Sequence, residues 1–180
     1  MNMENTTFDF DYPFKKKAHE FLKTALDNEN AEFKYQQLEA ILSAVKDRSK
    51  LLLVQKTGWG KSMVYFIATK ILRDPEYASN VLGLESKLGP AIMVSPLLSL
   101  MRNQVLAGKR IIDIDLINHK QTLEEYEAVK RRVLASEVDL LIITPERLSN
   151  PEFVQNILNP IAPTISTLII DEVHCVSDWG

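Results

Sequence analysis

The sequence of 180 residues has little that would tie it to a membrane, a disulfide framework or a zinc site. Its single cysteine, Cys175, cannot form a disulfide within the chain, and no spacing of cysteine and histidine matches a zinc ligand set. No apolar run approaches the roughly 18 residues of a membrane span. The first residues, Met1 to Glu4, begin neither a signal peptide nor a myristoylation site. These absences predict a soluble cytoplasmic protein in a reducing compartment, with no membrane partner.

An excess of positive charge is also absent. The formal net charge of −3 argues against a protein that binds nucleic acid through bulk electrostatics, although it leaves room for a local basic strip. One lysine-rich stretch, residues 15–23, has helical spacing and is expected to be a solvated helix face rather than a phosphate site. The length suits one domain with its own hydrophobic core.

Apolar periodicity predicts an α/β domain. Residues 1–12 are expected to form an N-terminal arm and residues 13–180 a single domain. Helical spacing predicts a first helix that begins at Pro13. It predicts further helices over residues 35–47, 63–72, 96–106, 124–135 and 151–158. Apolar runs predict buried strands at 51–54, 91–94, 111–117, 138–143 and 165–170, and 73–89 reads as a polar connection. Continuous apolar strands separated by helices indicate a three-layer fold, with a parallel sheet covered by helices on both faces.

A glycine loop follows the first of these predicted strands. Residues 51–55 lead into the loop 56–60, which is followed by Lys61 and Ser62. Backbone N–H groups of such a loop, together with the positive end of the next helix, bind phosphate oxygens. The pattern predicts that Lys61 reaches the β- and γ-phosphates of a triphosphate and that the Ser62 hydroxyl coordinates Mg²⁺. Gln55 replaces the first glycine of the strict G-x-x-x-x-G-K-[ST] pattern, so only the last part of that pattern is met.

Two adjacent acids, Asp171 and Glu172, end the last predicted strand. In P-loop NTPases an acid in this position holds the Mg²⁺ that bridges the β- and γ-phosphates, and Asp171 fits that role. Glu172 is expected to orient and deprotonate the attacking water. An isolated acid pair after a strand is more often a helix cap with a first-turn acid. With Lys61 and Ser62 upstream, the catalytic interpretation is favoured, and the strand ends at Gln55, Ser95, Thr144 and Asp171 are expected to gather along one edge of the sheet.

Five blocks then occur in a fixed order: 33–41 (FKYQQLEAI), 57–62 (TGWGKS), 94–105 (VSPLLSLMRNQV), 144–148 (TPERL) and 171–180 (DEVHCVSDWG). Together they resemble the first RecA-like domain of RecQ-like DNA helicases, within superfamily 2. The third and fifth blocks point to that branch rather than to the RNA helicases of the DEAD-box group. The resemblance implies a P-loop NTPase fold, ATP and Mg²⁺ as cofactors, and DNA as partner, both single-stranded and at duplex junctions.

The resemblance also assigns roles to individual residues. Gln37 resembles the glutamine that reads the adenine edge, where an amide both donates and accepts, and Lys34 stands where the family usually has arginine. His174 resembles the residue that links the nucleotide site to the DNA-binding surface. The expected catalytic residues are Lys61, Asp171, Glu172 and His174, and the expected metal ligands are Ser62 and Asp171. The expected nucleotide-binding residues are Lys34, Gln37, Thr57, Gly58, Trp59, Gly60, Lys61 and Ser62.

DNA contact is expected on two further blocks and on the last one. Short hydroxyls at strand ends suit phosphate contacts, which position a strand without reading its sequence, and Trp179 resembles the start of an aromatic-rich loop that stacks on bases. The alternative for Ser95 and its neighbours is a helix cap followed by core leucines. The expected DNA-binding residues are Ser95, Ser99, Arg102, Thr144, Arg147 and Trp179.

The sequence departs from the family pattern in further respects, one of which is a longer connection over 73–89. Lys56 and Trp59 replace the proline and glycine that are usual in the phosphate loop, and the printed chain stops within the aromatic-rich block. A second RecA-like domain, which in this class supplies a transition-state arginine, is therefore expected in a longer chain. Two other interpretations stay open: a nucleotide-binding scaffold without motor activity, and a superfamily 2 ATPase that hydrolyses ATP on DNA without unwinding it.

Overall fold

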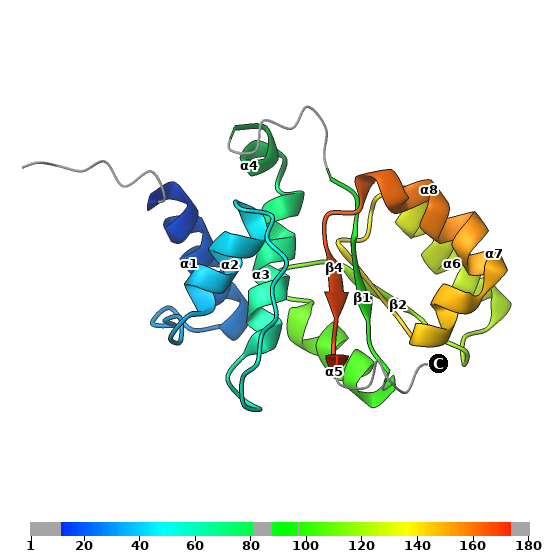
Figure 1. Ribbon diagram of the computed structural model, residues 1–180, viewed down its shortest axis with the longest axis horizontal. Helices are drawn as coiled ribbons and strands as arrows, with labels where there is room; N and C mark the ends of the chain where they lie inside the picture. The colour runs from blue at the N-terminus through cyan, green and yellow to red at the C-terminus, as the bar shows by residue number, and fades with distance from the viewer. Residues whose placement is uncertain (1–11, 81–87, 97, 174–180) are drawn as a thin grey trace, which may run out of the picture.

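A computed structural model of the protein describes residues 12–80, 88–96 and 98–173 (Figure 1). Residues 1–11 of the predicted N-terminal arm, His174 and Trp179 lie outside the described residues, and Tyr12, the last residue of that arm, begins α1. The helices are α1 (Tyr12–Leu26), α2 (Gln37–Val45), α3 (Lys61–Arg73), α4 (Pro75–Asn80), α5 (Leu98–Gly108), α6 (Leu123–Leu134), α7 (Pro151–Phe153) and α8 (Asn159–Ile161). The strands are β1 (Ala91–Val94), β2 (Ile114–Ile117), β3 (Leu140–Ile143) and β4 (Leu168–Ile170). Short turns of other helix types occupy Pro145–Ser149, Val154–Leu158 and Ala162–Thr164.

The strands form one parallel sheet in the order β2-β3-β1-β4. Because adjacent side chains of a strand point to opposite faces, each central strand contributes to two hydrophobic cores. Met93 and Ile142 pack on the side of α1, α2, α3 and α5. Ile92 and Leu141 pack on the other side, with residues of α6, α7 and α8. The predicted three-layer α/β fold with a parallel sheet is confirmed.

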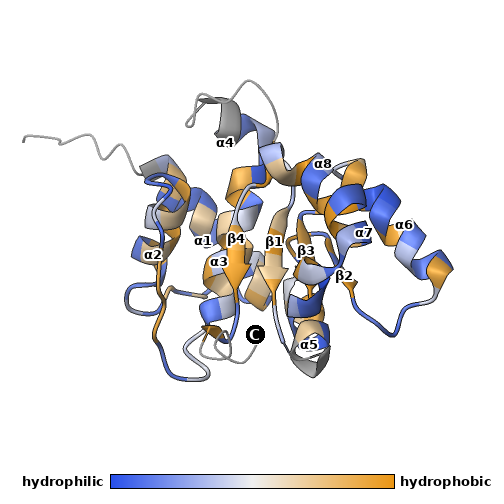
Figure 2. Cartoon of the chain, turned by 45° about the vertical axis from the view of Figure 1, so that its right-hand side comes forward, coloured by the Kyte–Doolittle hydropathy of each residue, from blue (hydrophilic) through white to orange (hydrophobic). Residues whose placement is uncertain are grey.

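Figure 2 shows the strands as hydrophobic ribbons between helices whose outer faces are hydrophilic. The pattern agrees with burial, since all four residues of β1 and all four of β3 are buried. In α1 the apolar positions at helical spacing are Phe14, Ala18, Phe21, Leu22 and Ala25, and all are buried except Phe21, which is partly buried. No described helix is long and apolar enough to cross a membrane.

The predicted strand at 51–54 is wrong. These residues adopt no strand, and the side chains of Leu52 and Val54 are 73% and 80% exposed. The neighbouring edge of the sheet is open as well, because Leu168 of β4 is 62% exposed. An apolar run indicates that a segment can form a strand, but it does not specify a pairing partner. The phosphate loop is therefore joined to the domain by contacts other than a strand ladder.

Two smaller predictions also differ from the structure. The connection over 73–89 contains the helix α4, whose first turn is capped by the Asp74 carboxylate, which accepts from the Tyr77 N–H at 3.0 Å. The apolar periodicity of the predicted helix 124–135 places both Val133 and Leu134 on its inner face; Val133 is fully buried, but Leu134 is 43% exposed. Thr122 and Glu125 form a capping box, in which each side chain accepts from the backbone N–H of the other residue. This box fixes the start of α6 and therefore sets which face of the helix is buried.

A buried arginine ties the phosphate-loop helix to the sheet. Arg73, at the end of α3, is 3% exposed and donates from Nε to the Asp139 carboxylate at 2.9 Å. Its Nη1 donates to Leu88 O at 2.6 Å, and its Nη2 donates to Ser136 O at 2.8 Å. Asp139 precedes β3 and also accepts from the Asp113 N–H at the start of β2. One guanidinium thus fixes the far end of α3 relative to two strands.

Candidate nucleotide site

The phosphate loop takes a conformation that glycine makes possible. Gly58 has φ 82° and Gly60 has φ 98°, both in the left-handed region that disfavours other residues. Helix α3 begins directly afterwards at Lys61, with Gly60 as its N-cap. The first N–H groups of an α-helix lack partners within the helix, and the helix dipole places positive charge at the same end. The loop and the start of α3 therefore offer the anion-binding geometry that the sequence predicted.

The buried side chain of Gln37 hydrogen-bonds to the backbone of this loop. Its side chain is 3% exposed; Nε2 donates to Trp59 O at 2.9 Å and to Gly60 O at 3.3 Å. Its Oε1 accepts from the Lys34 N–H at 2.8 Å, so both ends of the amide are used. Lys34 Nζ donates to Gly58 O at 2.7 Å. Both residues lie against the phosphate loop, where the sequence placed them, but they contact its backbone carbonyls.

Trp59 contributes to this arrangement through both its ring and its backbone. Its indole is 8% exposed and belongs to the hydrophobic core that α1, α2 and α3 share. The ring therefore anchors the loop to the domain. Its carbonyl oxygen is the acceptor for Gln37, and the residue itself has no positive φ.

A cavity of about 260 Å³ lies beside the loop and brings the two separate sequence signals together. Lys61 and Ser62 enter it from the start of α3, while Asp171 and Glu172 enter it from the end of β4. Lys61 Nζ donates to Gln55 O at 2.8 Å, which holds the ammonium at the loop. The cavity is lined by Lys56, Thr57, Gly58, Gly60, Lys61, Ser62, Tyr65, Gln104, Asp171 and Glu172.

The position of Asp171 follows from the sheet. Its N–H donates to Val94 O at 2.9 Å, which continues the β1–β4 ladder one residue beyond β4. Partial burial raises the pKa of the Asp171 carboxyl, and the neighbouring charge of Glu172 raises it further; the Glu172 N–H and the Lys61 ammonium act in the opposite direction. Lys61 and Asp171 are thus close enough to interact electrostatically. A cation in the cavity would stabilise the ionised form of this carboxylate.

The donor set suits Mg²⁺ bound together with a nucleotide. Ser62 offers a hydroxyl oxygen and Asp171 a carboxylate oxygen, the hard ligands that Mg²⁺ prefers. Among the described residues, no group of three or more histidine, cysteine, aspartate or glutamate side chains is arranged to hold a metal by itself. Mg²⁺ usually binds through one or two carboxylates plus substrate phosphates. The site therefore fits a metal that arrives with the nucleotide.

Three lining residues were not assigned to the nucleotide site from the sequence. Lys56 also lines the cavity, so two lysines and two acids belong to its wall. Tyr65 and Gln104 form another part of the wall, and the Tyr65 hydroxyl donates to Gln104 Oε1 at 2.6 Å. The spacing of Tyr65, three residues after Ser62 on the same helix, is the signal that places both on one face.

The residues expected to contact DNA are distributed along the same edge of the sheet. Ser95 N donates to Ile143 O at 3.0 Å, so Ser95 and Thr144 follow adjacent strands, next to Asp171. Both are buried, and among the described residues the Ser95 hydroxyl has no hydrogen-bond partner. Both side chains are therefore largely inaccessible from the surface. The edge that the sequence predicted is present at three of its four strand ends, Gln55 being the exception.

The remaining described residues of this group lie on flanking elements. Arg102 is exposed on α5, the helix that also carries Ser99. Arg147 donates from Nη2 to Asn118 O at 2.7 Å, and its guanidinium lies 5.6 Å from the centre of the Tyr126 ring. Arg147 is therefore engaged within the fold, and Arg102 is the more accessible cation.

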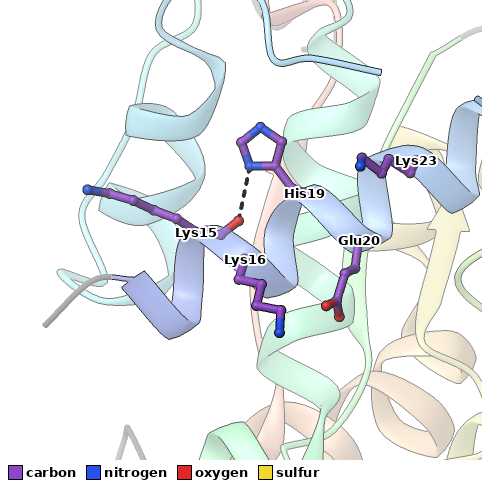
Figure 3. Close-up of a pocket in the computed structure, with 5 residues that line it drawn as sticks. All are labelled: Lys15, Lys16, His19, Glu20 and Lys23. Carbon is purple, nitrogen blue, oxygen red and sulfur yellow. Dashed lines mark hydrogen bonds between the residues drawn. The ribbon is translucent and has the colours of Figure 1, made fainter. Parts of the chain in front are cut away.

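A second hollow, of about 430 Å³, lies along α1 and is lined by Lys15, Lys16, His19, Glu20 and Lys23. Figure 3 shows that these side chains fan out from one helix and do not converge on a common point. His19 Nδ1 donates to Lys15 O at 3.1 Å, and its Nε2 lies 3.1 Å from Glu32 Oε2. The lysine-rich stretch is a helix surface, as the sequence indicated.

Comparison with known proteins agrees with this geometry. The DEAD/DEAH box helicase family matches residues 34–180. The chain is similar to the ATP-dependent DNA helicase RecQ of Haemophilus influenzae, with 30% identity over 87% of the chain, and to that of Pasteurella multocida, with 31% identity over 88%. It is also 32% identical, over 82% of its length, to the ATP-dependent DNA helicase RecQ of Bacillus subtilis. The matched region spans only 23% of the first two relatives. The chain belongs to the DEAD/DEAH box helicase family and is RecQ-like within it.

Proposed function

We propose that this chain is the ATP-binding part of an ATP-dependent DNA helicase. The observation that carries the proposal is the shared cavity, in which Lys61 and Ser62 of one segment meet Asp171 and Glu172 of another. These residues lie about a hundred positions apart in the sequence. A mere helix cap would not require the two acids to face the phosphate loop.

The chain's own residues divide the work of ATP hydrolysis between them. Loop N–H groups and the start of α3 bind the phosphate oxygens, and Lys61 exchanges Gln55 O for a phosphate. Ser62 and Asp171 would hold Mg²⁺, which when bound would neutralise charge that develops on the β- and γ-phosphates. Glu172 orients a water and takes its proton as that water attacks the γ-phosphorus. The bond to the bridging oxygen breaks, and ADP leaves with the electron pair.

The hydrolysis is proposed to drive movement on DNA. A strand bound along Arg102 and the neighbouring strand ends would contact the same edge of the sheet as the nucleotide. In a longer chain, a second RecA-like domain would close over the nucleotide and supply an arginine to the transition state. Alternate opening and closing of the two domains would move the protein along single-stranded DNA in the 3′-to-5′ direction and separate duplexes. His174 and Trp179 are proposed to link the two sites.

The test compares ATP turnover with and without single-stranded DNA, in the longest natural form of the protein and in its Lys61→Ala variant. We expect DNA to stimulate turnover in the wild type and the variant to lose most of its activity. Unchanged turnover in Lys61→Ala would remove the proposed mechanism. A strand-displacement assay separates a helicase from an ATPase that translocates without unwinding.

A further inference from the structure

One partly buried hydroxyl in the nucleotide cavity has no role in the chemistry described above. Tyr65 lies in the first turns of α3, and its hydroxyl donates to Gln104 Oε1 of α5 at 2.6 Å. Ser62 lies three residues earlier on the same face of α3 and lines the same cavity. Tyr65 therefore lies between a proposed metal ligand and a different helix, and all three residues line the same cavity.

The hydroxyl is suited to act as a fixed donor. Burial raises the pKa of Tyr65, and the nearby Asp171 carboxylate raises it further, so the phenol keeps its proton throughout the neutral range. The ring stands edge-on to Phe66, with 4.8 Å between the ring centres and 79° between the planes. Because the phenol has few alternative positions, a change on the side of the phosphate loop reaches its hydrogen bond to Gln104 more directly than it would through a mobile side chain.

Helix α5 has a second, apolar contact with α3 that is tightly packed. At Gly108, the last residue of α5, an added Cβ would lie 3.0 Å from two ring carbons of Phe66 and 2.3 Å from Ile114 Cδ1. The end of α5 is thus fixed against Phe66, while Gln104, one turn earlier, is held through the Tyr65 hydroxyl. The two contacts are made by adjacent residues of α3, the polar one by Tyr65 and the apolar one by Phe66. A rearrangement of α5 relative to α3 would therefore change the polar contact between Tyr65 and Gln104.

We propose that Tyr65 is a positioning residue that couples occupancy of the nucleotide cavity to the placement of α5. When a metal–nucleotide complex fills the cavity beside Ser62, the Tyr65 hydroxyl gains a new polar neighbour and its bond to Gln104 changes with it. The inference rests on the proposed function, since it takes Mg²⁺–ATP as the ligand of the cavity. Because α5 carries the exposed Arg102, the same contact would link nucleotide to DNA, and the effect must be reciprocal.

The test measures hydrogen exchange of the α5 amides with and without saturating Mg²⁺ and a non-hydrolysable ATP analogue. Tyr65→Phe removes the hydroxyl and keeps the ring, and Gln104→Ala removes the acceptor. Tyr35→Phe, at a side chain that is 82% exposed, is the matched control. We expect nucleotide to change α5 exchange in the wild type and in Tyr35→Phe, and to leave it unchanged in Tyr65→Phe, in Gln104→Ala and in the double variant.

A second measurement compares the affinity for the ATP analogue with and without oligo(dT). We expect a change of at least about fivefold in the wild type, at the lower end of common allosteric couplings, and a ratio near one in Tyr65→Phe. The inference is overturned if saturated Tyr65→Phe shows the wild-type change in α5, if Tyr35→Phe loses that change, or if Tyr65→Phe cannot be saturated. A wild-type protein that binds no Mg²⁺–nucleotide would instead refute the proposed function.

Discussion

Replacing Gly60 tests the packing between the phosphate loop and Gln37. A Cβ at Gly60 would lie 2.7 Å from Gln37 Nε2, and the residue has φ 98°. Gly58 has a similar φ of 82° but nothing within 4 Å of an added Cβ. Alanine at either position carries the left-handed penalty of about 1–2 kcal/mol, reduced by the lower entropy of the unfolded chain. Only Gly60→Ala adds a steric conflict, typically about 1–3 kcal/mol.

Urea denaturation followed by tryptophan fluorescence measures both effects as free energies of unfolding. We expect Gly58→Ala to lose about 1 kcal/mol and Gly60→Ala about 2–4 kcal/mol. In a Gln37→Ala background the conflict disappears, so the cost of Gly60→Ala should fall to that of Gly58→Ala. Equal losses for the two single variants, or an unchanged cost of Gly60→Ala without the Gln37 side chain, would refute the reasoning.

Three further substitutions test other parts of the account by urea denaturation. The pKa of Asp171 is higher in the folded than in the unfolded protein, so the folded state loses stability as the pH rises and this carboxyl ionises. Asp171→Asn should therefore be more stable than wild type at neutral pH and equally stable below about pH 3.9. The variant should also be unable to bind nucleotide through Mg²⁺. Leu52→Lys should change stability by less than about 0.5 kcal/mol, because the side chain is 73% exposed; a loss above about 1.5 kcal/mol would show that residues 51–54 are packed in the sheet. Arg73→Ala should lower the free energy of unfolding by about 3–5 kcal/mol, because it leaves the Asp139 carboxylate without its buried partner. A loss below about 1 kcal/mol would contradict the proposed role of Arg73 in fixing α3 to the sheet.

The sequence predicted the architecture well where side-chain pattern alone decides the outcome. The buried strands β1 and β3 are continuous apolar runs, and such runs arise when both faces of a parallel sheet are covered. The start of α3 was also predicted, because a glycine followed by Lys61 and Ser62 specifies both a turn and a helix N-terminus. The rule that parallel strands end at the same edge predicted that Lys61 and Asp171 would meet, and they line one cavity. The segment before Lys61 is not a strand, however, so the rule accounts only for the position of Asp171.

The parts that could not be predicted depend on contacts between distant segments. Leu51 to Val54 have the composition of a strand, but pairing depends on a neighbour that pattern does not reveal. Gln37 could be assigned to the site, whereas its bonds to the carbonyls of Trp59 and Gly60 depend on how α2 packs against α3. Residues that line a cavity from different helices, such as Gln104, become visible only when the helices are placed.

The central claim is that Lys61, Ser62, Asp171 and Glu172 surround a single Mg²⁺-bound nucleotide. The most direct measurement is a crystal structure of the protein with Mg²⁺ and a non-hydrolysable ATP analogue. We expect the phosphates in the cavity beside the loop, with Lys61 Nζ moved from Gln55 O to a phosphate oxygen and the metal between Ser62 and Asp171. A nucleotide bound elsewhere, for example along the lysines of α1, or phosphates that leave the two acids without a metal, would contradict the account.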